Sequence, residues 1–308
     1  MMGGRAQYEY ILRVKILLTG SSSYFAQALL PLLCEQSTID SVTGVDTRDA
    51  RFTHAKFRPV ALDIRSDGLA ALLHAHDALI HLASVVIPAR MSAADMFNVN
   101  VRAAHRLLRD ARAAGMTRLI HMSSAAVYGE AIHASEQTVL KPLPGFLYAE
   151  HEAHLDQLLA IELPECVRLR PQLIVGPRAH PAVKRLLKQP FYPRLPVPHP
   201  LFQCVHEDDL ARAVLLCLTR EVRGAYNIAI EDSLTVRDAI RARRRLNGAL
   251  PLTVAEFALK AAGRFYGWNA DPGILQALRH TLLVNCRRAS IELGWRSSYS
   301  ARAALATL

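Results

Sequence analysis

The chain has no apolar run that approaches the roughly 20 residues needed to span a bilayer. We expect no signal peptide, because Arg5, Glu9 and Arg13 interrupt the N-terminal stretch and no long apolar segment follows them. The five cysteines are widely spaced and form no C-x-x-C pair, which disfavours a disulfide framework and a dithiol redox motif. These absences predict a cytoplasmic protein with reduced thiols and no membrane partner.

Neither an internal repeat nor a low-complexity tract interrupts the 308 residues, and this length suits about two domains. The formal net charge of +10 favours anionic partners, including nucleotides. Arginines at positions 237, 241 and 243–245 make one segment strongly basic. Because no aromatic platform accompanies them, we interpret this segment as a solvated helix face and do not expect nucleic acid as a partner.

Glycine is scarce at the one place where a dinucleotide-binding fold has most of it. Residues 14–19 form a short apolar run without alternation, which is typical of a strand buried on both faces. Gly20 follows, but Ser23 and Ala26 occupy the second and third positions of the usual three-glycine pattern. A helix is expected after this turn, and a helix N-terminus suits a pyrophosphate. The turn is therefore either a cofactor loop or an ordinary strand–helix connection.

An acidic residue ends the second apolar run, residues 41–46, and this residue, Asp46, stands 26 positions after Gly20. In dinucleotide folds an acidic residue about 20 positions beyond the glycine binds the ribose 2′-hydroxyl and disfavours a 2′-phosphate. This spacing favours NAD as the cofactor. Alternatively, Asp46 only caps the turn that follows it. Arg48 and Arg51 could accept a 2′-phosphate, so NADP stays open.

Strand patterns alternate with helical patterns along the first 230 residues, which predicts an α/β protein with a doubly wound parallel sheet. Ligands of such sheets lie at the carboxyl ends of the strands. His81, inside the fourth strand pattern, is expected to be a hydrogen-bonded sheet residue and not a catalyst. The residues expected at the carboxyl ends are Gly20, Asp46, Asp63, Ala83 and Ser124. Strands are expected at 14–19, 41–46, 60–63, 77–83, 118–124, 167–170 and 225–229, and helices at 24–35, 93–114 and 149–160.

An ordered series of short motifs runs through almost the whole chain. The motifs lie at residues 19–20, 44–46, 63–64, 80–83, 98–100, 123–129, 170–171, 176–177, 205–211, 226–227 and 292–295. This series resembles the extended short-chain dehydrogenase/reductases, also called the NAD-dependent epimerase/dehydratase family. The resemblance implies a Rossmann fold with a smaller, discontinuous C-terminal substrate lobe. It assigns residues 1–170 and 203–230 to the dinucleotide-binding domain, and residues 171–202 and 231–308 to the substrate lobe.

The same resemblance implies the residues of the site. Members of the family bind a nicotinamide dinucleotide and move a hydride to or from a carbinol carbon, while a Ser or Thr orients the substrate oxygen and a Tyr exchanges its proton. Ser124 and Tyr148 match these two residues. The positions that match cofactor-binding residues are Gly20, Ser22, Ser23, Tyr24, Asp46, Asp63, Ile64, Leu82, Ala83, Asn100 and Glu152. The implied substrate is an anionic small molecule such as a nucleotide sugar, and a homodimer is expected because family members are often dimers.

The chain departs from the family at Glu152, which replaces the lysine expected four residues after the tyrosine. A phenol titrates at about pH 10 and needs a nearby cation to act as a base at neutral pH. Residues at i and i+4 share a helix face, so Glu152 is expected to raise the pKa of Tyr148 instead. A protonated His151 would restore part of the missing positive charge.

Two hypotheses follow for the activity. The retained Ser124 and Tyr148 favour a divergent NAD(P)-dependent oxidoreductase or epimerase that acts on a hydroxyl or keto carbon. Glu152 and Ser23 favour a cofactor-binding or scaffold protein of the same fold without turnover. The sequence leans toward the enzyme, because a protein without turnover need not keep both the serine and the tyrosine.

Two other activities are disfavoured by the residues present. Ala125 and Ala126 stand where family dehydratases carry an Asp-Glu pair, which argues against a sugar-nucleotide 4,6-dehydratase. His151 and His154 do not complete an H-E-x-x-H motif, so we expect no metal site.

The second half of the chain offers fewer indications. The proline-rich segment 190–200 suits either a substrate lid or a plain connector. The candidates for binding a substrate pyrophosphate are Arg178, Arg194 and Arg241.

Overall fold

The structure of the chain, a computed structural model, describes residues 13–87, 91–187, 191–194, 197–241, 248–251, 254, 257 and 276–308. Three arginines of the basic segment, at 243–245, lie outside the described residues, as do positions 190, 195 and 196 of the proline-rich segment.

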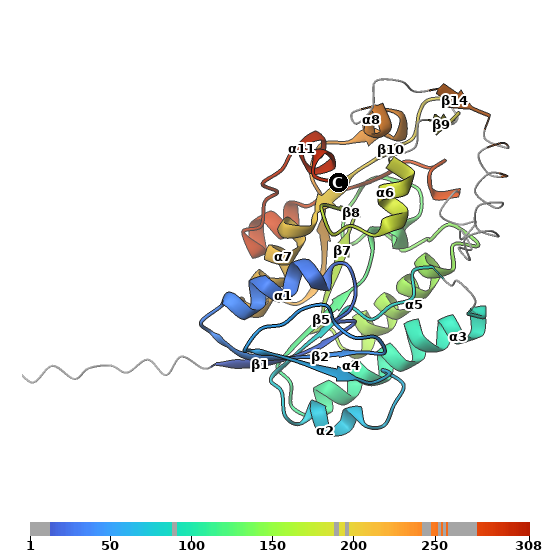
Figure 1. Cartoon of the computed structure of the whole chain (residues 1–308). Coiled ribbons are helices and arrows are strands. Elements are labelled where there is room, and N and C mark those ends of the chain that lie inside the picture. The colour runs from blue at the N-terminus through green and yellow to red at the C-terminus, as the bar shows by residue number, and fades with distance from the viewer. Residues whose placement is uncertain are drawn as a thin grey trace, which may run out of the picture.

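A seven-stranded parallel sheet forms the centre of the protein (Figure 1). Its strand order is β12-β7-β5-β4-β1-β2-β3, so the chain winds outward in both directions from β1. This confirms the predicted doubly wound α/β fold. The strands are β1 (Val14–Thr19), β2 (Ile39–Asp46), β3 (Phe57–Ala61), β4 (Ala78–His81), β5 (Arg118–Met122), β7 (Val167–Pro171) and β12 (Gly224–Ile228).

Helices cover both faces of this sheet (Figure 1). On one face, α1 (Ala26–Glu35) and α7 (Glu207–Thr219) pack against each other and share a hydrophobic core with the strands. On the other face, α2 (Leu69–Leu73), α4 (Ala104–Ala113) and α5 (Leu147–Glu162) close a second core. Burial on both faces explains why the central strands are apolar runs without alternation.

Several boundaries differ from the sequence-based expectation. The first helix begins at Ala26 and not at position 24, because residues 21–25 form a turn after β1. The third strand ends at Ala61, so Asp63 lies in the loop beyond it. The long helix expected at 93–114 is α3 (Ala93–Phe97), a π-helical turn η1 (Asn98–Ala103) and then α4.

The remaining elements gather beyond the carboxyl ends of the sheet (Figure 1). Their four-stranded sheet joins β6 (Ala131–Ala134), β10 (Leu201–Phe202), β13 (Leu234–Thr235) and β15 (Leu282–Val284). The strand pairs are β8 (Leu173–Val175) with β11 (Cys204–His206), and β9 (Phe191–Pro193) with β14 (Gly248–Leu250). The helices are η2 (Ala125–Tyr128), α6 (Pro181–Leu187), α8 (Val236–Arg241) and α11 (Ala301–Ala306), whereas η3 (Ala289–Leu293) packs against α7 and β12.

One strand and two buried side chains contact the lobe to which the sequence did not assign them. β6 lies within residues 1–170 but pairs with β15 of the smaller sheet. Leu293 and Trp295 lie within residues 231–308 but are buried in the core shared with α1 and α7. The division into two lobes stays a prediction. Among the described helices, none has both the length and the apolar character needed to cross a membrane.

Candidate functional site

The turn after β1 is pressed against the chain that follows β4. Gly20 has a φ of +75°, and a Cβ at this position would lie 2.7 Å from the backbone nitrogen of Ala83 and 2.8 Å from the carbonyl carbon of Leu82. Only glycine tolerates both the positive φ and this close approach. Gly20 also donates its N–H to the carbonyl of Val45 at 2.8 Å. The carboxyl ends of β1, β2 and β4 are thereby joined at one edge of the sheet.

Ser23 uses its side chain within the turn. Its Oγ accepts a hydrogen bond from the N–H of Ala26 at 3.2 Å, and its own N–H donates to the carbonyl of Gly20 at 3.0 Å. The hydroxyl is therefore turned toward the start of α1. In the described part of the chain, the N–H groups of Tyr24 and Phe25 have no acceptor.

Ser22 adds a donor to the same turn. Its Oγ is buried and has no hydrogen-bond partner among the described residues. A buried hydroxyl without a partner is costly, and so it is a candidate for contact with a ligand. Two free N–H groups and one orphaned hydroxyl at the N-terminus of a helix are the donors that a pyrophosphate requires. The residues present therefore fit a dinucleotide, although serine replaces glycine at position 23.

Asp46 ties the end of β2 to this turn. Its Oδ2 accepts the N–H of Ser22 at 3.0 Å, and its Oδ1 accepts the N–H of Arg48 at 3.0 Å. The guanidinium of Arg48 lies 3.8 Å from the same carboxylate. A carboxylate has about four acceptor sites, so Asp46 retains capacity for a ribose hydroxyl.

The other residues predicted to bind the cofactor divide between the loop after β3 and the loop after β4. Asp63 forms a bidentate pair with Arg65, at 3.0 Å and 2.7 Å, and these hydrogen bonds lower the pKa of Asp63. Ile64 beside it is buried. Asn100 is also buried, and both ends of its amide bond the backbone of Val85, at 2.7 Å and 2.9 Å. Asn100 therefore shapes the loop after β4 from within the protein.

Ser124 and Tyr148, predicted from the resemblance to act together, are in contact. Ser124 precedes η2 and accepts the N–H of Ala126 at 3.1 Å, and its hydroxyl lies near enough to the phenol of Tyr148 to influence the pKa of that phenol. Burial raises the pKa of Tyr148, the charge of Glu152 raises it further, and the hydroxyl of Ser124 opposes both. At neutral pH the phenol is therefore a proton donor and not a base.

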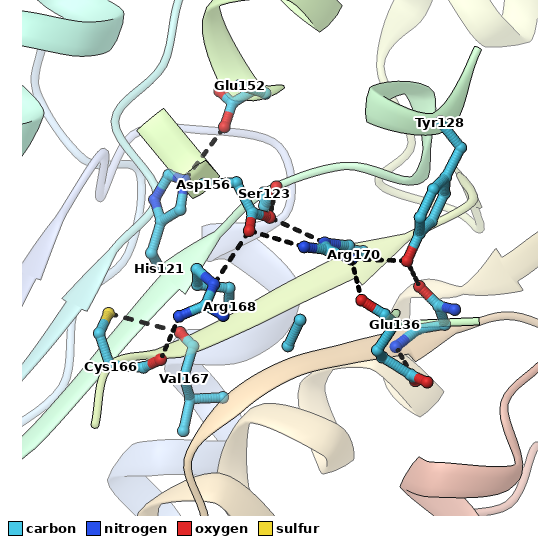
Figure 2. Close-up of polar contacts among 12 residues, drawn as sticks. His121, Ser123, Tyr128, Glu136, Glu152, Asp156, Cys166, Val167, Arg168 and Arg170 are labelled. Carbon is cyan, nitrogen blue, oxygen red and sulfur yellow. Dashed lines mark hydrogen bonds and ion pairs between the residues drawn. The ribbon is translucent and has the colours of Figure 1, made fainter. Parts of the chain in front are cut away.

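Glu152 is turned into the protein. Its side chain is 1% exposed, its Oε1 accepts from the hydroxyl of Ser84 at 2.8 Å, and its Oε2 lies 3.1 Å from Nε2 of His121 (Figure 2). Ser84 follows directly on Ala83, at the edge of the sheet where Gly20 lies. The carboxylate that replaces the family lysine thus lies beneath the candidate cofactor site and is held by two donors.

A row of polar residues crosses the sheet beneath α5. Thr19, His81, His121 and Arg168 are paired in register on β1, β4, β5 and β7. His81 bonds Thr19 at 2.7 Å through Nδ1, whereas its Nε2 has no partner among the described residues. The two imidazoles are stacked with centroids 5.5 Å apart. Burial, together with the neighbouring His121, lowers the pKa of His81 to about 3, so His81 is neutral.

A second buried cluster centres on Asp156, which is fully buried one turn beyond Glu152 on α5 (Figure 2). Asp156 accepts hydrogen bonds from Arg168 at 2.9 Å, from Arg170 at 2.7 Å and 2.8 Å, and from Ser123 at 2.9 Å. Although burial opposes it, the two guanidinium groups and Ser123 lower the pKa of Asp156. Sequence reasoning missed Asp156, although its i+4 spacing from Glu152 indicates that both share a helix face.

His151 does not replace the missing lysine, and this hypothesis is wrong. Its ring packs edge-on against Phe97 at 5.3 Å, and burial lowers its pKa, so it carries no charge at neutral pH. The exposed His154 packs against the same phenylalanine at 5.6 Å. Within the described residues, no three side chains of His, Cys, Asp or Glu are grouped as a metal site would require.

The segment after β8 reaches the cofactor turn. The ring of His180 lies edge-on to that of Tyr24, with centroids 5.0 Å apart. Arg178, one of the arginines predicted to bind a pyrophosphate, instead pairs with the buried Glu207 at 3.3 Å. The side chain of Arg241 lies outside the described residues.

Sequence comparison gives a family for this arrangement. The sequence model of the NAD dependent epimerase/dehydratase family matches residues 16–229, which is more than half of the chain. Among curated proteins, an uncharacterised protein of Mycobacterium tuberculosis is 22% identical over 317 residues, which cover 92% of this chain and 80% of that protein.

Solved structures share the fold at low identity. MoeE5 in complex with UDP-glucuronic acid and NAD has a TM-score of 0.77 and 23% identity, with 95% of this chain and 97% of that one covered. UDP-glucose 4-epimerase from Thermus thermophilus in complex with NAD has a TM-score of 0.75 and 18% identity, with 95% and 97% covered. The UDP-glucose 4-epimerase from Thermotoga maritima with UDP-glucose has a TM-score of 0.74 and 17% identity, with 94% and 96% covered. These likenesses concern the architecture of the chain.

Proposed function

This chain belongs to the NAD dependent epimerase/dehydratase family, and we propose that it is an NAD(H)-dependent oxidoreductase or epimerase acting on a hydroxyl or keto carbon of a nucleotide sugar. The observation that carries the proposal is the position of Ser124 beside Tyr148, at the carboxyl edge of the sheet. The unused donors of the turn after Gly20 lie at the same edge.

The cofactor would be held mainly by three features of the chain. The N–H groups of Tyr24 and Phe25 and the hydroxyl of Ser22 would bind its pyrophosphate, and Asp46 would accept from the adenosine ribose. Asp63 would border the adenine. When bound, a nicotinamide cofactor supplies or removes a hydride.

At the reacting oxygen, the protein contributes position and a proton. The hydroxyl of Ser124 is fixed at the N-cap of η2, and it orients a substrate oxygen toward the phenol of Tyr148. Tyr148 holds its proton firmly, because burial and Glu152 both raise its pKa. The phenol is therefore protonated at neutral pH, and it can donate to a substrate oxygen that becomes more basic than the phenolate during the reaction.

A nucleotide sugar is supported by the solved relatives and by charge. MoeE5 was crystallised with UDP-glucuronic acid and with UDP-glucose. This chain carries a formal net charge of +10, which favours an anionic substrate. The competing function is that of a cofactor-binding or scaffold protein of the same fold without turnover, and the observation in its favour is Glu152 at the place of the family lysine.

Titration of the protein with NADH and NADPH, followed by nicotinamide fluorescence, tests the cofactor. We expect saturable binding of NADH, and no binding of either at millimolar concentration would overturn the proposal and leave a scaffold. Turnover is then assayed with UDP-glucose, UDP-glucuronic acid and their 4-keto derivatives. Tyr148→Phe should lower turnover about a hundredfold or more, whereas Tyr299→Phe, remote from the site, should leave it unchanged. Full activity of Tyr148→Phe would remove Tyr148 from the reaction.

A further inference from the structure

Glu152 is the feature that the family resemblance does not explain. It stands four residues after Tyr148, so both side chains project from the same face of α5. Two donors from other elements, Ser84 and His121, fix its carboxylate at 2.8 Å and 3.1 Å. A buried carboxyl group that accepts two hydrogen bonds is stabilised in its ionised form.

The charges of the buried polar residues between α5 and the sheet, which we call the buried layer, also favour an ionised Glu152. Asp156 and Glu152 supply two negative charges, and Arg168 and Arg170 supply two positive charges. His81 adds none, because it is neutral. Asp156 bonds both arginines and neutralises one of them, which leaves one positive charge in the layer to offset Glu152. A lysine at position 152 would leave this layer with two uncompensated positive charges.

We propose that Glu152, clamped between Ser84 and His121, is a fixed negative charge one helical turn from Tyr148 that keeps this tyrosine protonated in the resting site, so that a carbonyl substrate meets a proton donor when it binds. Glu152 is a positioning residue in this scheme, since it acts through Tyr148. The inference rests on the proposed function and names the form in which the substrate meets the resting site: a nucleotide sugar that enters as a ketone.

The reaction balances with NADH as the reductant. The carbonyl carbon takes a hydride from the reduced cofactor, which becomes NAD⁺, and the carbonyl oxygen takes the proton of Tyr148. The C=O double bond becomes a C–O single bond, a C–H and an O–H bond form, and the O–H bond of the phenol breaks. The phenolate then regains a proton from water. The reverse reaction starts from the phenolate, and Glu152 keeps this form scarce in the resting site at neutral pH.

Other charged and titratable groups around Glu152 do not cancel its effect. Asp156 on α5 is neutralised by the arginines of β7. Cys166, just before β7, is buried and its pKa is raised to about 12, so it carries no charge. His81 on β4 and His151 on α5 are neutral. Among the groups that face it, the imidazole of His121 is in direct contact with the carboxylate, and it serves as the hydrogen-bond donor.

The test measures the ionisation of Tyr148 without any cofactor. The protein is labelled with ¹³Cζ-tyrosine, and Tyr148→Phe identifies the NMR signal of Tyr148. In the wild-type protein this signal should not titrate up to pH 11. In Glu152→Gln, which keeps the shape of the side chain, the pKa of Tyr148 should fall by about one unit or more, as expected for the loss of a like charge. Glu152→Asp should keep the pKa high. Glu150→Gln, on the same helix but bonded to the N–H of Gly145, is the matched control and should cause no shift.

Each outcome decides the inference. A wild-type Tyr148 that titrates at or below pH 10 overturns it, even if Glu152→Gln fails to fold. An unchanged pKa in a folded Glu152→Gln overturns it as well. The kinetic counterpart is the pH at which kcat/KM of alcohol oxidation reaches its full value, which should fall in Glu152→Gln together with the pKa of Tyr148. If NADH does not bind, the proposed function fails while the NMR result stands. If NADH binds and the pKa does not move, only the role of Glu152 fails.

Discussion

The imidazole of His81 stacks on that of His121 across two neighbouring strands, with ring centroids 5.5 Å apart. Both rings are 1% exposed, and each has one nitrogen without a hydrogen-bond partner among the described residues. The pair can remain buried because His81 stays neutral. Its neutrality makes the stability of the protein depend on pH.

Acidification should destabilise the protein through His81. Its pKa is 6.5 when unfolded and about 3 when folded, so between these values the unfolded chain binds a proton that the folded chain does not. The free energy of unfolding should therefore fall as the pH drops below 6.5, by up to about 5 kcal/mol near pH 3. Melting temperatures between pH 7.5 and 5 check this. His81→Gln should flatten the profile, whereas His74→Gln, at an exposed site, should not. An equally steep profile in His81→Gln would contradict the assignment.

Neutralising Asp156 should be among the most damaging substitutions in the chain. Asp156→Asn leaves Arg168 and Arg170 buried without a counter-charge, which costs about 3–5 kcal/mol. Denaturant unfolding at pH 7 measures the loss. Asp110→Asn, an exposed change on α4, serves as the control and should stay within about 0.5 kcal/mol of the wild type. Equal stability of the two variants would show that the buried cluster contributes little.

A methyl group at Gly20 should disrupt the cofactor turn. Gly20→Ala places a Cβ 2.7 Å from the backbone of Ala83, and this backbone cannot move without displacing the end of β4. Gly115→Ala is a matched control, because Gly115 also has a positive φ of +92° but has nothing within 4 Å. The control should cost about 1–2 kcal/mol from conformation alone. Gly20→Ala should cost more and should also weaken NADH binding, measured by fluorescence. Similar losses in both variants would indicate that φ alone matters.

Asp46 should set the preference for NADH over NADPH. Its carboxylate is anchored by Ser22 and Arg48 at the end of β2, where a 2′-phosphate would meet a negative charge. Asp46→Asn should shift the ratio of the two dissociation constants toward NADPH by about tenfold, which corresponds to about 1.4 kcal/mol. Asp49→Asn, exposed in the same loop, should leave the ratio unchanged. A wild-type protein that prefers NADPH would refute this role.

The sequence predicted the sheet well because the signals for its strands, short apolar runs, lie within each strand. Apolar runs such as residues 14–19 mark strands buried on both faces, and the alternation with helices leaves few other topologies. The helix start was placed too early because Tyr24 and Phe25 are compatible with a helix, and only the packing of the turn on Ala83 shows otherwise. The meeting of Ser124 with Tyr148 came from the resemblance, and the structure brings the two together.

The contacts within the buried polar layer could not be predicted from the sequence. Glu152 could be recognised as a departure from the family, but its partners come from other elements: His121 from β5, and Ser84 from the loop after β4. Which residues of parallel strands oppose each other depends on register, and strands buried on both faces lack the apolar alternation that would reveal it. Asp156 and Arg168 likewise meet only after folding.

The balance of two carboxylates and two guanidinium groups under α5 also bears on how this site could change during evolution. A single mutation that placed lysine at position 152 would bury a third cation beside Arg168 and Arg170 and would deprive Ser84 and His121 of their acceptor. A lysine at this position would therefore require compensating changes on β5 or β7. The neighbours of the glutamate thus constrain which residues position 152 can accept.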